Sequence, residues 1–188
     1  MRIAAKAVAA LTTLLTPFAM LASAQHASAS STQYYSLVAY GACGRIAPVR
    51  ELTEATGGYV TAKSGLFTWN FTITNSTSRV HWQACGAGAP YGNYDVRAQR
   101  LSQTFAFTVT SPQVTSCTVP LGSCSGGIGS KTITATQAAY NVSSMTYYLN
   151  GQSISAVYPA RVTVRASASV ITGAYGGSVT TAAKAWAF

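Results

Sequence analysis

Few residues in this chain could carry out acid–base catalysis. The sequence holds three carboxylates, Glu51, Glu54 and Asp95, and two histidines. A glycoside hydrolase usually needs two carboxylates placed across the bond that it cleaves. Glu51 and Glu54 lie three positions apart and would share a face if they lay on a helix. Beside Arg50, however, they have the composition of an ordinary solvated turn, so we do not expect this pair to be catalytic.

Nucleophilic catalysis would depend on His81, Asp95 and Ser125, which occur in the chain order of trypsin-like proteases. The Ser-Gly-Gly sequence that starts at Ser125 also resembles the region around the nucleophile of that family. The resemblance ends there, because no aspartate precedes the serine, and His81 and Asp95 lie too close together in the sequence. A catalytic triad is defined by geometry, and the sequence alone gives no support for one.

Metal and cofactor sites are not expected either. Zinc sites use closely spaced ligand pairs such as Cys-x-x-Cys, and none of the four cysteines forms such a pair. The glycines at 122–130 precede no predicted helix, so they do not form a dinucleotide-binding loop. We therefore predict that the protein is not an enzyme and holds no metal and no cofactor.

The first 24 residues have the features of a leader for export. Arg2 and Lys6 precede an apolar run at 7–22, and Ala22-Ser23-Ala24 matches the small-residue pattern that signal peptidase cuts. A second possible cut follows Ala29. Removing residues 1–24 lowers the formal net charge from +9 to +7. We expect a secreted, periplasmic or cell-surface protein, with no later apolar run long enough for a spanning helix.

The cysteines of an exported chain are expected to form disulfides. Four cysteines allow three pairings. We favour Cys117–Cys124, which would close a small loop, together with Cys43–Cys85, which would tie two strands.

Composition and periodicity predict an all-β fold. Thr, Val and Tyr are abundant, and these residues favour pleated sheet. Apolar and polar residues alternate at 66–74, 79–85, 104–110 and 161–170, as expected for strands with one buried face. In the first of these segments, Phe67, Trp69, Phe71 and Ile73 would share the buried face. The predicted fold class is a disulfide-tied antiparallel β-sandwich, with a small barrel as the alternative.

Three local predictions accompany this fold. Residues 25–42 would form an extended arm or first strand, ahead of a single domain at 43–188. Residues 48–56 would form one short helix, which starts at Pro48 and stops at Gly57-Gly58. Asn150-Gly151 would form a type I′ hairpin turn and place Tyr147 opposite Ile154.

Exposed aromatic side chains could bind sugars by stacking, although many aromatics in strands simply fill the core. The candidates for ligand stacking are Tyr34, Tyr35, Tyr91, Tyr94 and Tyr148.

The end of the chain resembles the last strand of exported pilin-type subunits, including the spore-coat-U-like group of chaperone–usher pili. Gly173-Ala174-Tyr175 is followed by Val179, and the chain ends on Ala185-Trp186-Ala187-Phe188. A cysteine pair early in the mature chain also fits this family. Gly177 stands where the spore-coat-U motif has an aspartate, and the second cysteine pair is extra.

This resemblance implies an incomplete immunoglobulin-like sandwich that is completed by a neighbour's strand. We therefore expect a non-catalytic structural or adhesive protein, such as a fibre subunit, which binds itself or other subunits by strand addition. One alternative is a carbohydrate-binding module with a polysaccharide ligand. Another is a small outer-membrane barrel, because Trp186 and Phe188 match the ending of such proteins. The basic residues are spread along the chain, so nucleic acid is not an expected partner.

Overall fold

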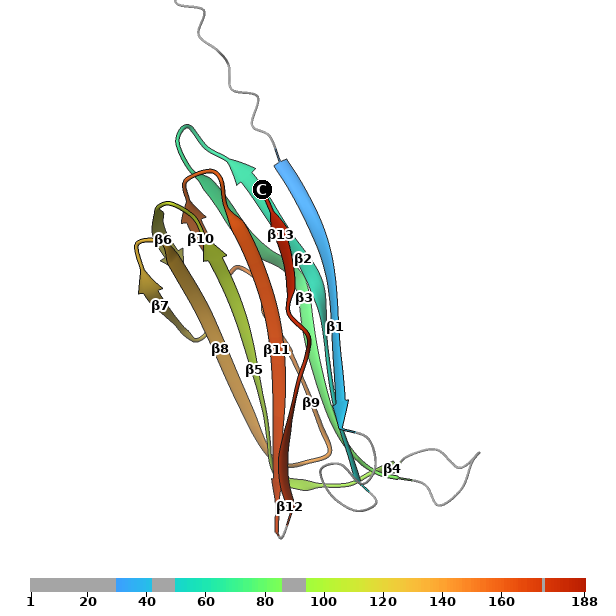
Figure 1. The fold of residues 1–188 in the computed structure, drawn as a ribbon. Coiled ribbons are helices and arrows are strands. Elements are labelled where there is room, and N and C mark those ends of the chain that lie inside the picture. Colours follow the sequence, from blue (N-terminus) through green and yellow to red (C-terminus); the bar gives the residue numbers. More distant parts are fainter. Residues whose placement is uncertain (1–29, 42–49, 86–93, 174) are drawn as a thin grey trace, which may run out of the picture.

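The computed structural model describes residues 30–41, 50–85, 94–173 and 175–188, and its strands form two antiparallel sheets that face each other as a sandwich (Figure 1). The seven-stranded sheet, sheet A, consists of β1 (Ser30–Gly41), β2 (Arg50–Ser64), β3 (Trp69–Ala84), β4 (Tyr94–Asp95), β6 (Val114–Thr118), β9 (Ser144–Tyr148) and β10 (Ser153–Ala156). The six-stranded sheet, sheet B, consists of β5 (Ala98–Thr110), β7 (Ser123–Gly127), β8 (Ser130–Val142), β11 (Arg161–Thr172), β12 (Tyr175–Thr180) and β13 (Lys184–Ala187).

Both sheets are open. In sheet A the order is β1-β2-β3-β10-β6, and β4 and β9 also pair with β3. In sheet B the order is β12-β11-β5-β8-β7, and β13 pairs with β11 beyond the end of β12. The predicted all-β sandwich is therefore confirmed. Among the described residues, no helix has the length and hydropathy needed to span a membrane.

The core lies between the sheets and follows the predicted alternation. Phe105, Phe107 and Val109 of β5 are buried, as are the apolar residues of β11 from Val162 to Val170. The prediction for the segment at 66–74 is partly wrong. Phe71 and Ile73 are buried in β3, but Phe67 lies in the turn before the strand and is 81% exposed.

The predicted short helix is wrong. Arg50 to Thr56 lie in β2, which pairs with β1 on one side and with β3 on the other. Leu52, Glu54 and Thr56 alternate inward along this strand. Pairing on both sides outweighs the weak helix signals of the segment. Pro48, the predicted start of the helix, lies outside the described residues.

The predicted Asn150-Gly151 hairpin is also wrong. β9 and β10 do not pair with each other, because both run antiparallel to β3, one after the other. Asn150 and Gly151 form a turn between them, and of these two residues only Gly151 has positive φ, at 82°. A type I′ turn requires positive φ at both positions. Asn150 and Gly151 therefore separate two short strands that follow one another along the same side of β3, and the chain does not reverse its direction there.

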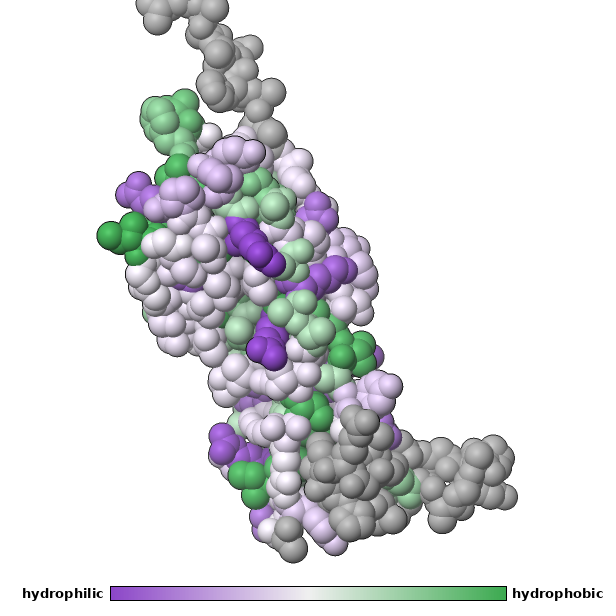
Figure 2. All heavy atoms as spheres, viewed as in Figure 1, coloured by the Kyte–Doolittle hydropathy of each residue, from purple (hydrophilic) through white to green (hydrophobic). Residues whose placement is uncertain are grey.

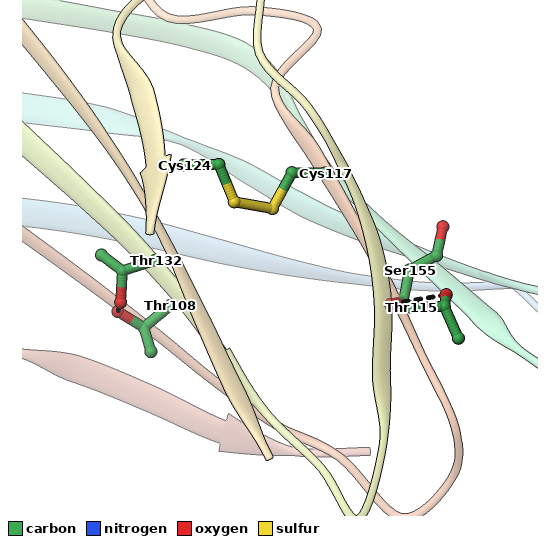
Figure 3. Close-up of a disulfide and its surroundings, with 6 residues drawn as sticks. All are labelled: Thr108, Thr115, Cys117, Cys124, Thr132 and Ser155. Carbon is green, nitrogen blue, oxygen red and sulfur yellow. Dashed lines mark hydrogen bonds between the residues drawn. A yellow bond between two sulfur atoms is a disulfide. The ribbon is translucent and has the colours of Figure 1, made fainter. Parts of the chain in front are cut away.

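The opening strand and one disulfide agree with expectation. β1 pairs with β2 from Ser30 to Gly41, and the rest of the predicted arm lies outside the described residues. Cys117 of β6 is bonded to Cys124 of β7, so the disulfide ties an edge of sheet A to an edge of sheet B (Figure 3). Cys85 is disulfide-bonded too. Cys43 lies outside the described residues, so its pairing with Cys85 stays a prediction.

Candidate functional site

The residues considered for hydrolytic chemistry lie in different parts of the fold. His81 is in β3, and Asp95 is in β4, next to the end of β3. Ser125 is in β7, an edge strand of the other sheet, near the opposite end of the molecule (Figure 1). Asp95 instead accepts hydrogen bonds from Gln83 Nε2 at 3.0 Å and from Ser143 Oγ at 3.4 Å.

The two neighbouring glutamates point to opposite sides of sheet A, because β2 is a strand. Glu51 accepts a hydrogen bond from Thr53 Oγ1 at 3.2 Å. Glu54 is fully buried between the sheets, so the prediction of an ordinary solvated turn is wrong. The described residues contain no group of three His, Cys, Asp or Glu side chains that could hold a metal ion, and the expected lack of a metal stays a prediction.

Glu54 is the centre of a buried polar cluster that sequence reasoning missed. Its Oε1 atom accepts hydrogen bonds from Thr56 Oγ1, from Ser78 Oγ at 3.1 Å and from Gln103 Nε2 at 3.2 Å. No hydrogen-bond partner is found for Glu54 Oε2 or for Gln103 Oε1, although both atoms are buried. These four side chains come from β2, β3 and β5, so the cluster bridges the two sheets.

Burial sets the protonation behaviour of this region. Loss of solvation raises the pKa of Glu54, and the hydrogen bonds from Thr56, Gln103 and Ser78 oppose that rise only in part. Burial also raises the pKa of Tyr147, and the negative charge of Glu54 adds to the effect. Burial raises the pKa of Tyr35 to about 12, although the hydroxyl lies 2.5 Å from Ser76 Oγ. Burial in this cluster therefore makes the charged form of Glu54 less favourable than it is in water.

This cluster divides the hydrophobic core into two parts. On one side lie Leu52, Val80 and Leu101, and on the other lie Val60 and Phe105. None of its four side chains lines the cavities given below for the described residues.

The predicted stacking aromatics separate into exposed and buried residues. Tyr34 and Tyr148 are exposed, at 55% and 66%. Tyr35 is fully buried and packs against Phe105, so its prediction as a ligand-stacking residue is wrong. Tyr94 lies in β4. Tyr91 lies outside the described residues.

Tyr59 is an exposed aromatic that the sequence analysis did not single out. It lies directly opposite Tyr34 across β1 and β2, and the ring centroids are 5.4 Å apart. Tyr34, Tyr59 and Tyr148 all belong to sheet A and point away from the core, because Tyr35, Val60 and Leu149 beside them point inward. Strand alternation through Val60 would have identified Tyr59 as the outward-facing neighbour.

A groove lies where the edge of β1 faces the edge formed by β12 and β13. One part, of about 370 Å³, lies between Val38–Gly41 and Ser178–Thr180. A second part, of about 250 Å³, lies between Ser36–Val38 and Ala182–Lys184. Val38 lines both parts, and we call them together the seam groove.

A lysine lies beside the seam groove, over two aromatic rings. The Lys184 ammonium is 5.9 Å from the centroid of the Tyr34 ring and 5.8 Å from that of Trp186. Both distances are in the range of cation–π attraction. Lys184, which lines the groove from β13 of sheet B, thus contacts the Tyr34 ring on β1 of sheet A.

Comparison of the chain with protein-family models, with curated proteins and with solved structures found no match.

Proposed function

We propose that the protein is a non-catalytic structural or adhesive component of a surface outside the cytoplasm, of the fibre-subunit type. It would join a second chain by addition of a strand along β1 at the seam groove. The observation that carries this proposal is the free outer edge of β1. Among the described strands, only β2 pairs with β1.

The sequence of β1 supports this use of its edge. Edge strands expose unpaired N–H and C=O groups, and natural proteins commonly protect them with charged residues, proline or bulges. The twelve residues of β1, SSTQYYSLVAYG, contain no charged residue and no proline. The ladder between β1 and β2 is also regular from end to end. Such an edge favours pairing with another strand.

The two lateral sides of the sandwich differ in a way that also supports this site. On one side, the Cys117–Cys124 disulfide ties β6 to β7 (Figure 3). On the other side, β1 faces β12 and β13 across the seam groove. A strand added to β1 would lie along this second side, where it could cover the groove.

Replacing Val38 with lysine tests the proposal. Val38 is 56% exposed and lines both parts of the groove, so a lysine there places a charge on the joining edge. We expect the wild-type protein to self-associate with rising concentration in sedimentation velocity, and Val38→Lys to weaken this association by at least about tenfold.

The matched control is Ser116→Lys, on β6 at the other edge of the same sheet. It adds the same charge to an exposed position and should leave association unchanged. A wild-type protein that stays monomeric at every concentration would contradict self-assembly, and so would equal effects of the two lysines. Circular dichroism of each variant checks that the fold is kept.

The outward tyrosines of sheet A favour a second candidate function, the binding of polysaccharide. Tyr34, Tyr59 and Tyr148 share one sheet face, and aromatic rings on such a face can stack against sugar rings. In affinity electrophoresis with soluble β-glucan and with alginate, we expect retardation of the wild-type protein. Tyr59→Ala should weaken binding about fivefold. Tyr140→Ala, at an exposed tyrosine of sheet B, should not. If neither polysaccharide retards any of the three proteins, these ligands are excluded.

A further inference from the structure

One end of the sandwich carries apolar side chains at the tips of three loops. Leu66 and Phe67 in the β2–β3 turn are 72% and 81% exposed, Ile128 in the β7–β8 turn is 74% exposed, and Tyr158 between β10 and β11 is 62% exposed. We call these four residues the loop-tip patch. Figure 2 shows hydrophobic groups projecting at this end of the molecule.

Backbone contacts place the three loops at the same end. Val114 N–H donates to Ile128 C=O at 2.6 Å, and Val157 N–H donates to Gln113 C=O at 2.8 Å. Ala156 pairs with Trp69, the first residue after the β2–β3 turn. A cavity of about 410 Å³ lies at the same end, and its apolar lining includes Pro112, Pro159, Ala160 and Phe188.

The charged side chains around this patch are basic. Lys63 lies at the end of β2, Lys131 at the start of β8 and Arg161 at the start of β11. The three carboxylates of the chain lie elsewhere, since Glu51 and Glu54 are in the other half of β2 and Asp95 is in β4. Lys63 is nine positions after Glu54 in this strand, which is about 30 Å at 3.3 Å per residue. The loop-tip end is thus apolar at its tips and positively charged behind them.

We propose that the loop-tip patch inserts into the interface of an anionic lipid bilayer. Separate projecting side chains suit a fluid interface, which can close around each one, whereas a protein partner would need a matching surface. Apolar residues and tyrosine are favourable at this depth, and basic residues behind them would lie level with the anionic headgroups. The proposal is independent of strand addition, because the seam groove is lined by β1, β12 and β13 and not by these loops.

Vesicle co-sedimentation with paired variants tests this assignment. The probes are vesicles of equimolar phosphatidylglycerol and phosphatidylcholine, and vesicles of phosphatidylcholine alone. We expect the wild-type protein to bind the mixed vesicles more tightly, and Ile128→Ser to weaken that binding about tenfold. Ile171→Ser is the matched control, since Ile171 is also exposed and lies in β11 beside Arg100 of β5, at the other end.

A second pair of variants tests the charges. Arg161→Gln at the loop-tip end should weaken binding to the mixed vesicles about fivefold, and Arg100→Gln at the opposite end should not. The wild-type protein and all variants carry the same N-terminal segment, so any contribution of that segment to vesicle binding cancels in each comparison.

Three results would overturn the proposal. The first is a wild-type protein that stays in the supernatant with the mixed vesicles. The second is equal binding to both kinds of vesicle, or equal losses within either pair of variants. The third is a wild-type protein that does not bind vesicles but self-associates, with a self-association that Ile128→Ser removes. That result would assign the patch to contact with a second copy of the chain.

Discussion

Glu54 lies in an environment that is unusual for a carboxylate. It is a carboxylate enclosed between two sheets, with donors on one oxygen and no partner found for the other. A buried polar atom without a partner costs about 1–3 kcal/mol. Protonation of Oε2 removes the buried charge, which agrees with the raised pKa of Glu54.

We expect Glu54→Gln to raise the free energy of unfolding at neutral pH by about 1 kcal/mol. The amide keeps an oxygen for Thr56, Ser78 and Gln103, and its NH₂ group replaces the charged, unpartnered oxygen. Urea unfolding followed by fluorescence measures the change. Glu51→Gln, on the opposite face of the same strand, is the control and should have little effect.

The raised pKa of Glu54 predicts how the stability of the protein changes with pH. The pKa of Glu54 is raised in the folded protein, so the folded state binds this proton more tightly than the unfolded state does. The stabilisation is fully present below the unfolded pKa of about 4.3 and is lost as the pH rises through the folded pKa. Glu54→Gln should therefore flatten this decline. A decline that is unchanged in the variant would contradict the assignment to Glu54.

At the scale of elements, the irregularities of sheet A lie side by side. The β2–β3 register shifts between Gly57 and Tyr59. On the facing stretch of β3, Asn75 has a φ of 47°. In the turn between β9 and β10, the two strands on the other side of β3, Asn150 Oδ1 accepts a hydrogen bond from Ser76 N–H at 2.7 Å. Three neighbouring segments are thus interrupted along one line across the sheet.

Gly58 allows the strands to approach closely along this line. A Cβ atom at Gly58 would lie 2.7 Å from Ser76 Cα, whereas one at Gly57 would be no closer than 3.6 Å to any atom outside its chain neighbours. We therefore expect Gly58→Ala to lower the free energy of unfolding by about 1–3 kcal/mol, with Gly57→Ala as the adjacent control. Thermal unfolding of both variants measures the difference, and equal melting temperatures would contradict the close approach.

Sequence periodicity predicted the strands better than their interruptions. The alternation in β5 and β11 identified their buried faces correctly, because each strand keeps one register throughout. In β3 the buried positions change from Phe71 and Ile73 to Ser76 and Ser78, so two strands were predicted where there is one. Where the register shifts, β3 has one residue more than β2. The position of this extra residue depends on pairing with β2 and β9, and such long-range partners are not encoded in a local pattern.

At the scale of the whole molecule, the sequence predicted the fold class but not the arrangement of its edges. Composition and alternation indicated a sandwich, and close spacing indicated the Cys117–Cys124 pair. The seam groove and the loop-tip patch depend on which strands become neighbours and which turns share an end. Leu66 and Phe67 continue an apolar pattern into a turn, so only the strand boundary shows that they are exposed.

The long pairing of β1 with β2 has a mechanical consequence. All twelve residue pairs of this ladder lie along one axis. Tension applied along that axis would load the pairs together in shear, whereas tension across it would peel them apart one at a time. A chain attached along β1 would therefore be held most firmly against forces parallel to the strand.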